Sequence, residues 1–222
     1  MRAHRRDYRR PIAPTTALTT SELATATRRL VRLDPAFGPV VRAGGPCVLQ
    51  GPGRRPSHFA SLASAICHQQ LAGAAARTIH GRFEALFDGP PTPAGTLAVG
   101  PERLRACGLS GAKTASVLDL AARAEAGEVR LRSLGRLGDE AVIEELVSVR
   151  GIGRWTAEMF LMFQLGRGDV WPVDDLGVRN GWGVVHASAA PNAKELRALG
   201  DPIVGVRSVA AWYCWRAVDL GR

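Results

Sequence analysis

The feature that most constrains the fold is a tight glycine turn between two predicted helices. The turn is Gly151-Ile152-Gly153, and apolar residues recur at helical spacing before it, over 139–149, and after it, over 154–165. Glycine adopts positive φ and lets another backbone approach closely, so a very short turn can join two helices. The sequence therefore predicts a helical hairpin over about 139–165.

Helical periodicity continues along most of the remaining chain, and no segment shows a convincing series of alternating strand residues. Thr20 or Ser21 is a candidate cap for the first helix. Gly- and Pro-rich composition predicts turns or a short strand over 38–56 and loops over 88–93 and 131–137. Helices are expected over 23–33, 57–87 with a division near Gly73, 101–107, 110–126, 139–149, 154–165, 175–182, 194–199 and 204–218. The expected fold class is all-α, with roughly eight to ten helices.

The ends of the chain divide it into an arm and a core. Residues 1–18 carry Arg, Pro and Thr without periodicity, which predicts a flexible basic arm before a helical core over 19–222. A solvated tail without a role has the same composition. No unbroken apolar run reaches about 18 residues, and no apolar signal core follows the basic start. We therefore expect no membrane span and a cytoplasmic protein, associated with the nucleoid if bacterial.

The charge balance indicates a polyanionic partner. The formal net charge is +9 and the sequence pI about 10.6, which most simply predicts nucleic acid binding. The alternative is a composition bias, because the chain is rich in Arg, Ala and Gly. The four cysteines are far apart and form no CxxC pair, so the usual close-spaced ligands of zinc and iron–sulfur sites are missing.

The glycine turn has a chemical consequence of its own. The first amides of a helix lack intrahelical acceptors, and together with the helix dipole they form an anion site. A phosphate could reach these amides because glycine has no side chain. A GxG between helices is a weak signal when it stands alone, since a plain turn explains it equally well.

The wider pattern resembles a known family. Leu146, the Gly-Ile-Gly turn and Thr156-Ala157 are followed one helix and one loop later by Asp175. This order resembles the helix–hairpin–helix/Gly-Pro-Asp superfamily of DNA glycosylases, and within it the 3-methyladenine DNA glycosylase II group. Further motifs that resemble this group are Ala65–Leu71 with Ala74-Ala75, Gly108–Ser110 with Lys113 and Leu120-Ala121, and Arg207–Arg216. The resemblance covers about residues 57–218.

The chain also departs from the family pattern. The family often has an aromatic–Arg-Pro-aromatic approach to the last motif, whereas this chain has Ile203-Val204-Gly205-Val206. The outer wall of the pocket is therefore expected to be less aromatic. The N-terminal sheet domain of longer relatives has no room here, so the resemblance is to a compact form.

The resemblance implies a fold and an activity. The fold would be a two-lobed helical glycosylase with the active-site cleft between the lobes. The protein would flip out alkylated bases such as 3-methyladenine and hydrolyse the N-glycosidic bond, leaving an abasic site in base excision repair. Its partner would be double-stranded DNA with alkylated bases, bound by a monomer.

The resemblance also implies roles for individual residues. Asp175 matches the catalytic aspartate, whose charge would stabilise the sugar as the base leaves, and Asp174 is then expected to cap the helix. Trp155 and Trp215 match base-pocket positions. Met159 and Phe163 follow Trp155 at i+4 and i+8 and are expected to share its face. A capping pair and ordinary core residues are the structural alternatives.

Other matched positions would contact DNA. His68 is the candidate wedge that fills the gap left by the flipped base, and Gln69 would bond backbone or minor-groove edges. The remaining DNA contacts are expected from Gly151, Ile152, Gly153, Arg154 and Thr156. No cofactor is expected to be required. The resemblance implies a possible structural Na⁺ or K⁺ at the hairpin, held by the backbone carbonyls of Val147, Val149 and Ile152.

The lysines favour one reaction type. Lyase relatives place a lysine nucleophile where this chain has Trp155. The only lysines are Lys113 and Lys194, and neither lies in the hairpin. A monofunctional hydrolase is therefore favoured over a lyase. Two alternatives stay open: a glycosylase for another damaged purine, and a non-catalytic helix–hairpin–helix protein that only binds DNA.

Overall fold

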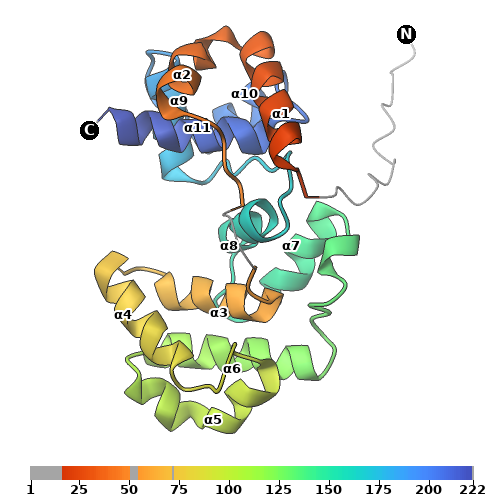
Figure 1. The fold of residues 1–222 in the computed structure, drawn as a ribbon, viewed down its shortest axis with the longest axis vertical. Coiled ribbons are helices and arrows are strands. Elements are labelled where there is room, and N and C mark those ends of the chain that lie inside the picture. The colour runs from red at the N-terminus through yellow and green to blue at the C-terminus, as the bar shows by residue number, and fades with distance from the viewer. Residues whose placement is uncertain (1–16, 51–54, 72, 222) are drawn as a thin grey trace.

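The chain folds into two helical lobes joined by a helical connector (Figure 1). The computed structural model describes residues 17–50, 55–71 and 73–221, and these residues form eleven α-helices and no strand. One lobe contains α1 (Thr20–Leu33), α2 (Gly38–Gly44), α9 (Leu176–Val185), α10 (Ala193–Leu199) and α11 (Arg207–Leu220). The other contains α3 (His58–His68), α4 (Gly73–Glu84), α5 (Pro93–Ala106) and α6 (Gly111–Glu125). The connector contains α7 (Asp139–Val147), α8 (Arg154–Met159) and a π-helical turn at Phe160–Gln164.

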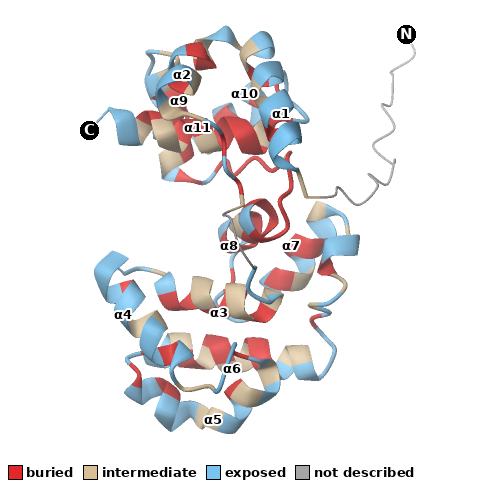
Figure 2. Cartoon of the chain, in the orientation of Figure 1, coloured by how far each residue is buried: buried red, intermediate tan, exposed pale blue. Residues whose placement is uncertain are grey.

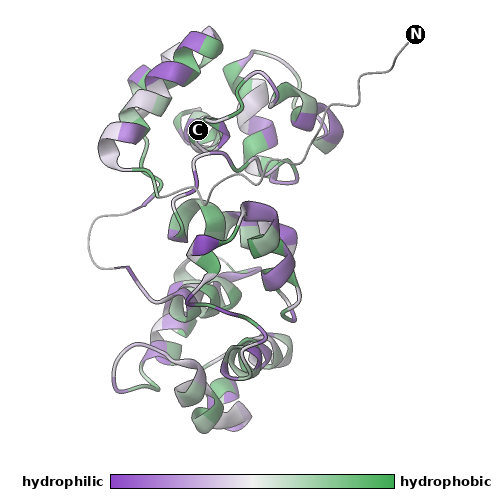
Figure 3. Cartoon of the chain, turned by 90° about the vertical axis from the view of Figure 1, so that its right-hand side faces the viewer, coloured by the Kyte–Doolittle hydropathy of each residue, from purple (hydrophilic) through white to green (hydrophobic). Residues whose placement is uncertain are grey.

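Each lobe buries the apolar stripes of its own helices. Leu62 and Ile66 of α3 are fully buried together with Val117 and Leu120 of α6. Figure 2 shows buried residues on the facing sides of these helices, on α11 and around α8, where the two lobes meet. The helices are amphipathic rather than uniformly apolar (Figure 3), and no helix among the described residues is long and apolar enough to cross a membrane.

In the lobe that contains α1, α2 and α9 to α11, called the C-terminal lobe below, α9 and α11 pack with their backbones in contact. A Cβ atom at Gly181 of α9 would lie only 2.0 Å from the carbonyl oxygen of Cys214 in α11. The two backbones therefore touch, and glycine is required between them. This packing brings the start of α9, where Asp175 lies, next to Trp215 of α11.

The segment that returns from the connector to the C-terminal lobe is pinned at several points. Arg167 is 1% exposed and donates through Nη2 to the carbonyl oxygens of Gly135 (3.0 Å) and Leu137 (2.9 Å). Ser208 Oγ donates to the carbonyl oxygen of Arg167 at 2.7 Å and accepts the Val170 amide at 2.9 Å. These bonds fix the segment that leads into Asp175.

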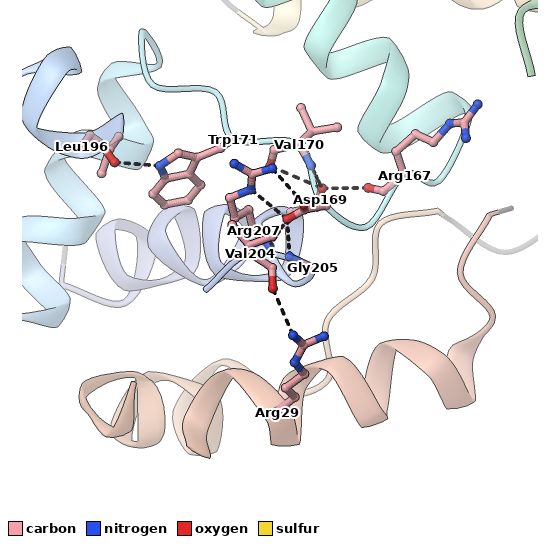
Figure 4. Close-up of polar contacts among 10 residues, drawn as sticks. Arg29, Arg167, Asp169, Val170, Trp171, Leu196, Val204, Gly205 and Arg207 are labelled. Carbon is pink, nitrogen blue, oxygen red and sulfur yellow. Dashed lines mark hydrogen bonds and ion pairs between the residues drawn. The ribbon is translucent and has the colours of Figure 1, made fainter. Parts of the chain in front are cut away.

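The first turn of α11 adds an ion pair to the same segment. Arg207 donates from Nε and Nη2 to the two carboxylate oxygens of Asp169, both at 2.8 Å (Figure 4). Gly205 donates its amide to the same carboxylate at 2.6 Å. Arg207 is therefore used within the lobe, to hold the returning segment against α11.

The all-α prediction is confirmed for the described residues, but several boundaries differ. The prediction of turns or a short strand over 38–56 is wrong for residues 38–44, which form α2. Pro39 lies in the first turn of that helix, where a missing amide removes no hydrogen bond. The helix predicted over 101–107 is present as the second half of α5, and a further helical segment, capped by Thr92, precedes it from Pro93; Gly100, with φ +77°, is non-helical and forms the kink between the two. The additional helix α2 brings the number of α-helices among the described residues to eleven, above the expected range.

The first helix is capped by Thr19 rather than by Thr20 or Ser21. Residues 1–16 of the expected basic arm lie outside the described residues. Leu18, which the prediction assigned to the arm, donates its amide to the carbonyl oxygen of Gly166 at 3.2 Å and packs against the core.

Candidate active site

The carboxylate of Asp175 is the centre of the candidate site. Asp175 is the N-cap of α9, and its Oδ1 accepts the Val178 amide at 2.8 Å. Oδ1 also accepts Nε1–H of Trp215 at 2.9 Å, and Oδ2 accepts Nε1–H of Trp155 at 2.7 Å. The side chain is 9% exposed. The expectation that Asp174 caps this helix is wrong: the capping residue is Asp175, and Asp174 is exposed.

Three aromatic rings from three elements gather near this carboxylate. Trp155 lies in the first turn of α8, Trp215 on α11, and Phe163 in the π-helical turn. The rings of Phe163 and Trp215 have centroids 5.8 Å apart. Trp155 is 46% exposed and Phe163 is 40% exposed, an unusual exposure for large aromatic side chains. The predicted pocket residues Trp155, Phe163 and Trp215 therefore lie around Asp175.

Met159 and Phe163 lie on a neighbouring recess. The α-helical part of this segment ends at Met159, and the π-helical turn that follows places more residues in each turn. Simple i+4 and i+8 spacing from Trp155 therefore does not hold beyond Met159. Met159 and Phe163 border a recess of about 350 Å³ between α3 and α8. Its other lining residues are Ser61, Leu62, Ser64, Ala65, His68, Thr156, Phe160 and Gln164.

A larger cavity, of about 760 Å³, lies at the opposite end of α3. It is lined by the start of α3, the end of α6 and the loop over 129–133, and by no predicted site residue. The smaller recess, which is bordered by the predicted site residues His68, Met159 and Phe163 but not by Asp175, Trp155 or Trp215, is therefore the better candidate for part of the functional site.

The glycine turn lies between the C-terminal end of α3 and the middle of α6. Gly151 has φ +77°, and a Cβ atom there would lie 2.4 Å from Ser116 Oγ of α6. Gln69, just after α3, donates Nε2–H to the carbonyl oxygen of Gly151 at 2.9 Å. Gly151 and Gly153 are exposed, whereas Ile152 is buried. No side chain caps α8 at Gly153, so the first amides of α8 have no side-chain partner at that cap.

The remaining predicted DNA contacts occupy different environments. Arg154 is paired with Glu140 of α7 (Nη2–Oε1 2.6 Å) and with Glu158 of its own helix (Nε–Oε1 3.1 Å). Thr156 is buried and borders the recess. The structure thus brings Gln69 to the turn, while Arg154 is engaged by two carboxylates.

His68 is the last residue of α3 and is exposed. Its Nδ1 lies 2.8 Å from the carbonyl oxygen of Ser64, and its ring centroid lies 5.1 Å from that of His80 in α4. Two residues later, the exposed Gln70 has φ +54°. Non-glycine residues rarely adopt this conformation, and such strain is common at functional loops. Nothing in the sequence signals it.

Burial shifts the pKa of two side chains, Glu158 of α8 and Lys113 of α6. Burial raises the pKa of Glu158 to about 7, although the neighbouring Arg154 acts in the opposite direction. Burial also lowers the pKa of Lys113, whose Nζ donates to the carbonyl oxygen of Cys67 at 2.8 Å. Sequence reasoning missed Glu158 and also Gly177, which lies directly against Trp215.

Comparisons with known proteins show the family to which the chain belongs. Residues 63–203 match the family described as HhH-GPD superfamily base excision DNA repair protein. DNA-3-methyladenine glycosylase 1 of Schizosaccharomyces pombe is 36% identical over 166 residues, 73% of this chain and 73% of that protein. The alkylbase DNA glycosidase-like protein mag2 of the same organism is 30% identical over 209 residues, 91% of this chain and 97% of that protein.

Solved structures are similar over most of the chain. The S. pombe 3-methyladenine DNA glycosylase Mag1, in complex with abasic DNA, superposes with a TM-score of 0.74 at 32% identity. The match covers 86% of this chain and 95% of that one. A DNA-3-methyladenine glycosidase from Bacillus halodurans has a TM-score of 0.77 at 32% identity, covering 86% and 88% of the two chains.

Proposed function

Because the chain belongs to the HhH-GPD superfamily of base excision DNA repair proteins, we propose that it is a monofunctional DNA glycosylase for alkylated bases. It hydrolyses the N-glycosidic bond of bases such as 3-methyladenine and leaves an abasic site. The names of its relatives in S. pombe support this substrate class. The enzyme acts in the cytoplasm as a monomer on double-stranded DNA.

The observation that carries the proposal is the carboxylate of Asp175 among aromatic rings. Loss of a base leaves positive charge on the sugar, and a fixed carboxylate nearby stabilises that charge. Asp175 accepts three N–H donors, from Trp155, Trp215 and Val178, which fix the position of its carboxylate. The same carboxylate orients the incoming water.

The rings supply base recognition. An alkylated purine is cationic and electron-poor, and the faces of Trp155, Phe163 and Trp215 attract such a ring by roughly 0.5–2 kcal/mol per contact. Met159 and Phe163 border the recess between α3 and α8, whose lining residues include no Asp, Glu, Lys or Arg side chain. Recognition therefore rests on ring faces and on the weakened bond of the damaged base.

The glycine turn and the end of α3 hold the DNA. The exposed Gly151 and Gly153 present backbone amides to a phosphate, and Gln69 positions the turn by its bond to Gly151. His68 enters the gap left by the flipped base. The turn also offers backbone carbonyls at Val147, Val149 and Ile152. The Val149 carbonyl also accepts the Ile152 amide at 3.1 Å, and a carbonyl oxygen has a second lone pair. The three oxygens would hold a Na⁺ or K⁺ ion that adds positive charge beside the phosphate.

The two lysines support hydrolysis without strand cleavage. A lyase attacks the sugar with an amine. Lys113 is bonded to the carbonyl oxygen of Cys67, and Lys194 lies at the start of α10. Neither contacts Asp175, whose side-chain partners are the two indoles. Among the described residues no lysine contacts Asp175, which supports water as the nucleophile.

The proposal is tested with duplex DNA methylated by an alkylating agent. Purified protein is expected to release 3-methyladenine, detected by chromatography, and to leave strands that break only after alkali treatment. Borohydride is expected to trap no covalent adduct. A protein that binds this DNA but releases no base would be either a glycosylase for another damaged purine or a DNA-binding protein only, and duplexes with other defined lesions separate these two. A trapped adduct would identify a lyase.

A further inference from the structure

We propose that the indole N–H groups of Trp155 and Trp215 are positioning groups that hold the Asp175 carboxylate, and that Gly177 is the residue that allows the Trp215 bond. This inference rests on the proposed function and deepens it. It assigns the two tryptophans a role beyond their ring faces. It also assigns a role to a glycine that contributes no side chain.

The bonds at Asp175 leave it little freedom. An ionised carboxylate has about four acceptor positions. Oδ1 uses two, for the Val178 amide and the Trp215 indole, and Oδ2 uses one for the Trp155 indole. About one position therefore remains, on Oδ2. The two indoles thus select the oxygen that receives the attacking water and fix the direction from which it approaches.

The two indole bonds come from distant parts of the chain. Trp155 lies 20 residues before Asp175 and Trp215 lies 40 residues after it. Trp215 is further held by the ring of Phe163, 5.8 Å away. The carboxylate is therefore clamped between the connector and the C-terminal lobe, so its orientation depends on how these two parts of the molecule meet.

Gly177 makes room for the Trp215 bond. A Cβ atom at Gly177 would lie 2.7 Å from Cδ1 and 2.9 Å from Nε1 of Trp215, and 3.1 Å from Oδ1 of Asp175. The backbone of Gly177 is helical rather than left-handed, so no backbone strain explains the glycine. Alanine would even favour the helix by about 1 kcal/mol. The close approach of the indole is what requires glycine here.

Trp212 provides a matched control on the same helix. It lies three residues before Trp215 and is half-buried, and its indole N–H has no hydrogen-bond partner among the described residues. Its ring instead lies under the Arg216 guanidinium, 5.8 Å from the centroid. Trp155→Phe and Trp215→Phe therefore each remove a hydrogen bond to Asp175. Trp212→Phe removes an indole of the same size without removing such a bond.

The first experiment measures single-turnover base release and DNA affinity. Trp215→Phe and Trp155→Phe keep an aromatic ring and lose the donor. A hydrogen bond to a charged group is worth enough to lower the rate about 10- to 100-fold when it is lost. Gly177→Ala should lower the rate of base release roughly tenfold or more. Trp215→Phe, Trp155→Phe and Gly177→Ala should each keep the wild-type affinity for DNA. Trp212→Phe should release base at the wild-type rate.

The second experiment observes the bonds directly. The five tryptophans give five indole signals in a ¹⁵N–¹H correlation spectrum, assigned with single Trp→Phe variants. Asp175→Asn is expected to move the Trp155 and Trp215 signals upfield and to leave Trp171, whose indole donates to the carbonyl oxygen of Leu196 at 2.8 Å, in place. Gly177→Ala should move the Trp215 signal and leave that of Trp171.

The possible failures are distinct. If the wild type releases base and both Trp215→Phe and Gly177→Ala match it, the positioning role is wrong and the proposed function stands. If the Trp155 and Trp215 signals do not respond to Asp175→Asn, the bonds do not exist in solution and the inference is wrong. If the wild type itself releases no base, the proposed function fails, and the spectra still decide whether the bonds form.

Discussion

At the scale of single residues, Asp175 combines two structural roles that usually belong to different groups. Its Oδ1 caps α9 through the Val178 amide, and the same carboxylate accepts both indole bonds. The cap fixes the side-chain torsion, because only one orientation reaches the amide three residues on. A capping aspartate is therefore already preorganised before DNA arrives, which is the condition for electrostatic catalysis.

Glu158 gives a prediction at the same scale. Burial raises its pKa from 4.5 to about 7. The positive charge of Arg154 partly opposes this rise, and the negative charges of Asp174 and Glu140 add to it. The folded chain therefore retains a proton there between these pH values that the unfolded chain has released. The free energy of unfolding should fall as pH rises from about 4.5 to 7. Glu158→Gln, which does not ionise, should show a smaller loss.

Urea denaturation of the wild type and of Glu158→Gln at several pH values measures this difference. The wild type should lose stability relative to the variant as pH rises across this window. A constant difference between the two proteins from pH 4.5 to 7 would mean that Glu158 keeps its ordinary titration and is not buried as described.

At the scale of elements, the candidate site depends on the contact between α9 and α11. This contact brings Asp175, the N-cap residue of α9, to Trp215 of α11. The contact depends on Gly181, where a Cβ atom would lie 2.0 Å from the Cys214 carbonyl oxygen and 2.4 Å from its carbon. Backbone atoms cannot move aside as a flexible side chain can. The two helices would have to separate to admit a methyl group.

Gly181→Ala is therefore expected to lower the free energy of unfolding by about 1–3 kcal/mol or more and to abolish base release. Gly81→Ala is the matched control, because Gly81 lies inside α4 with no atom within 4 Å of a Cβ atom. The control should stabilise the protein by about 0.5–1 kcal/mol. Thermal denaturation compares them, and equal stability of the two variants would contradict the close packing of α9 on α11.

Sequence reasoning predicted the elements better than their junctions. The hairpin around Gly151 was predictable because helical periodicity stops and resumes there. The glycines between the two helices indicate a tight turn. The π-helical turn at Phe160–Gln164 has no sequence signal, so the direction of Phe163 was not predictable. Asp174 and Asp175 have the same capping preference, and only the packing of α9 shows that the second of them is the cap.

At the scale of the whole molecule, two lobes meet at the connector, and the site lies at that junction. The class of fold was predictable from periodicity alone. The meeting of Trp155, Asp175 and Trp215 was not, because it depends on contacts between residues 20 and 40 positions apart. The resemblance to a known family predicted roles for these three residues. The structure adds the hydrogen bonds from the two indoles to the carboxylate.

The net charge of +9 leads to a prediction at this scale. If the protein neutralises about six phosphates, its affinity for duplex DNA should fall about 10³-fold between roughly 50 and 200 mM salt. Fluorescence anisotropy measures this. Arg130→Gln is the control, because Arg130 borders the cavity at the far end of α3 from His68 and should leave the slope unchanged. A salt-independent affinity would refute the phosphate contacts.

The central claim is that Asp175 carries the chemistry of base release. The most direct measurement is single-turnover release of 3-methyladenine from a methylated duplex by Asp175→Asn, with duplex affinity measured in parallel. The account predicts near wild-type affinity and a rate lowered by about 10²-fold or more. Release by Asp175→Asn at the wild-type rate would contradict it.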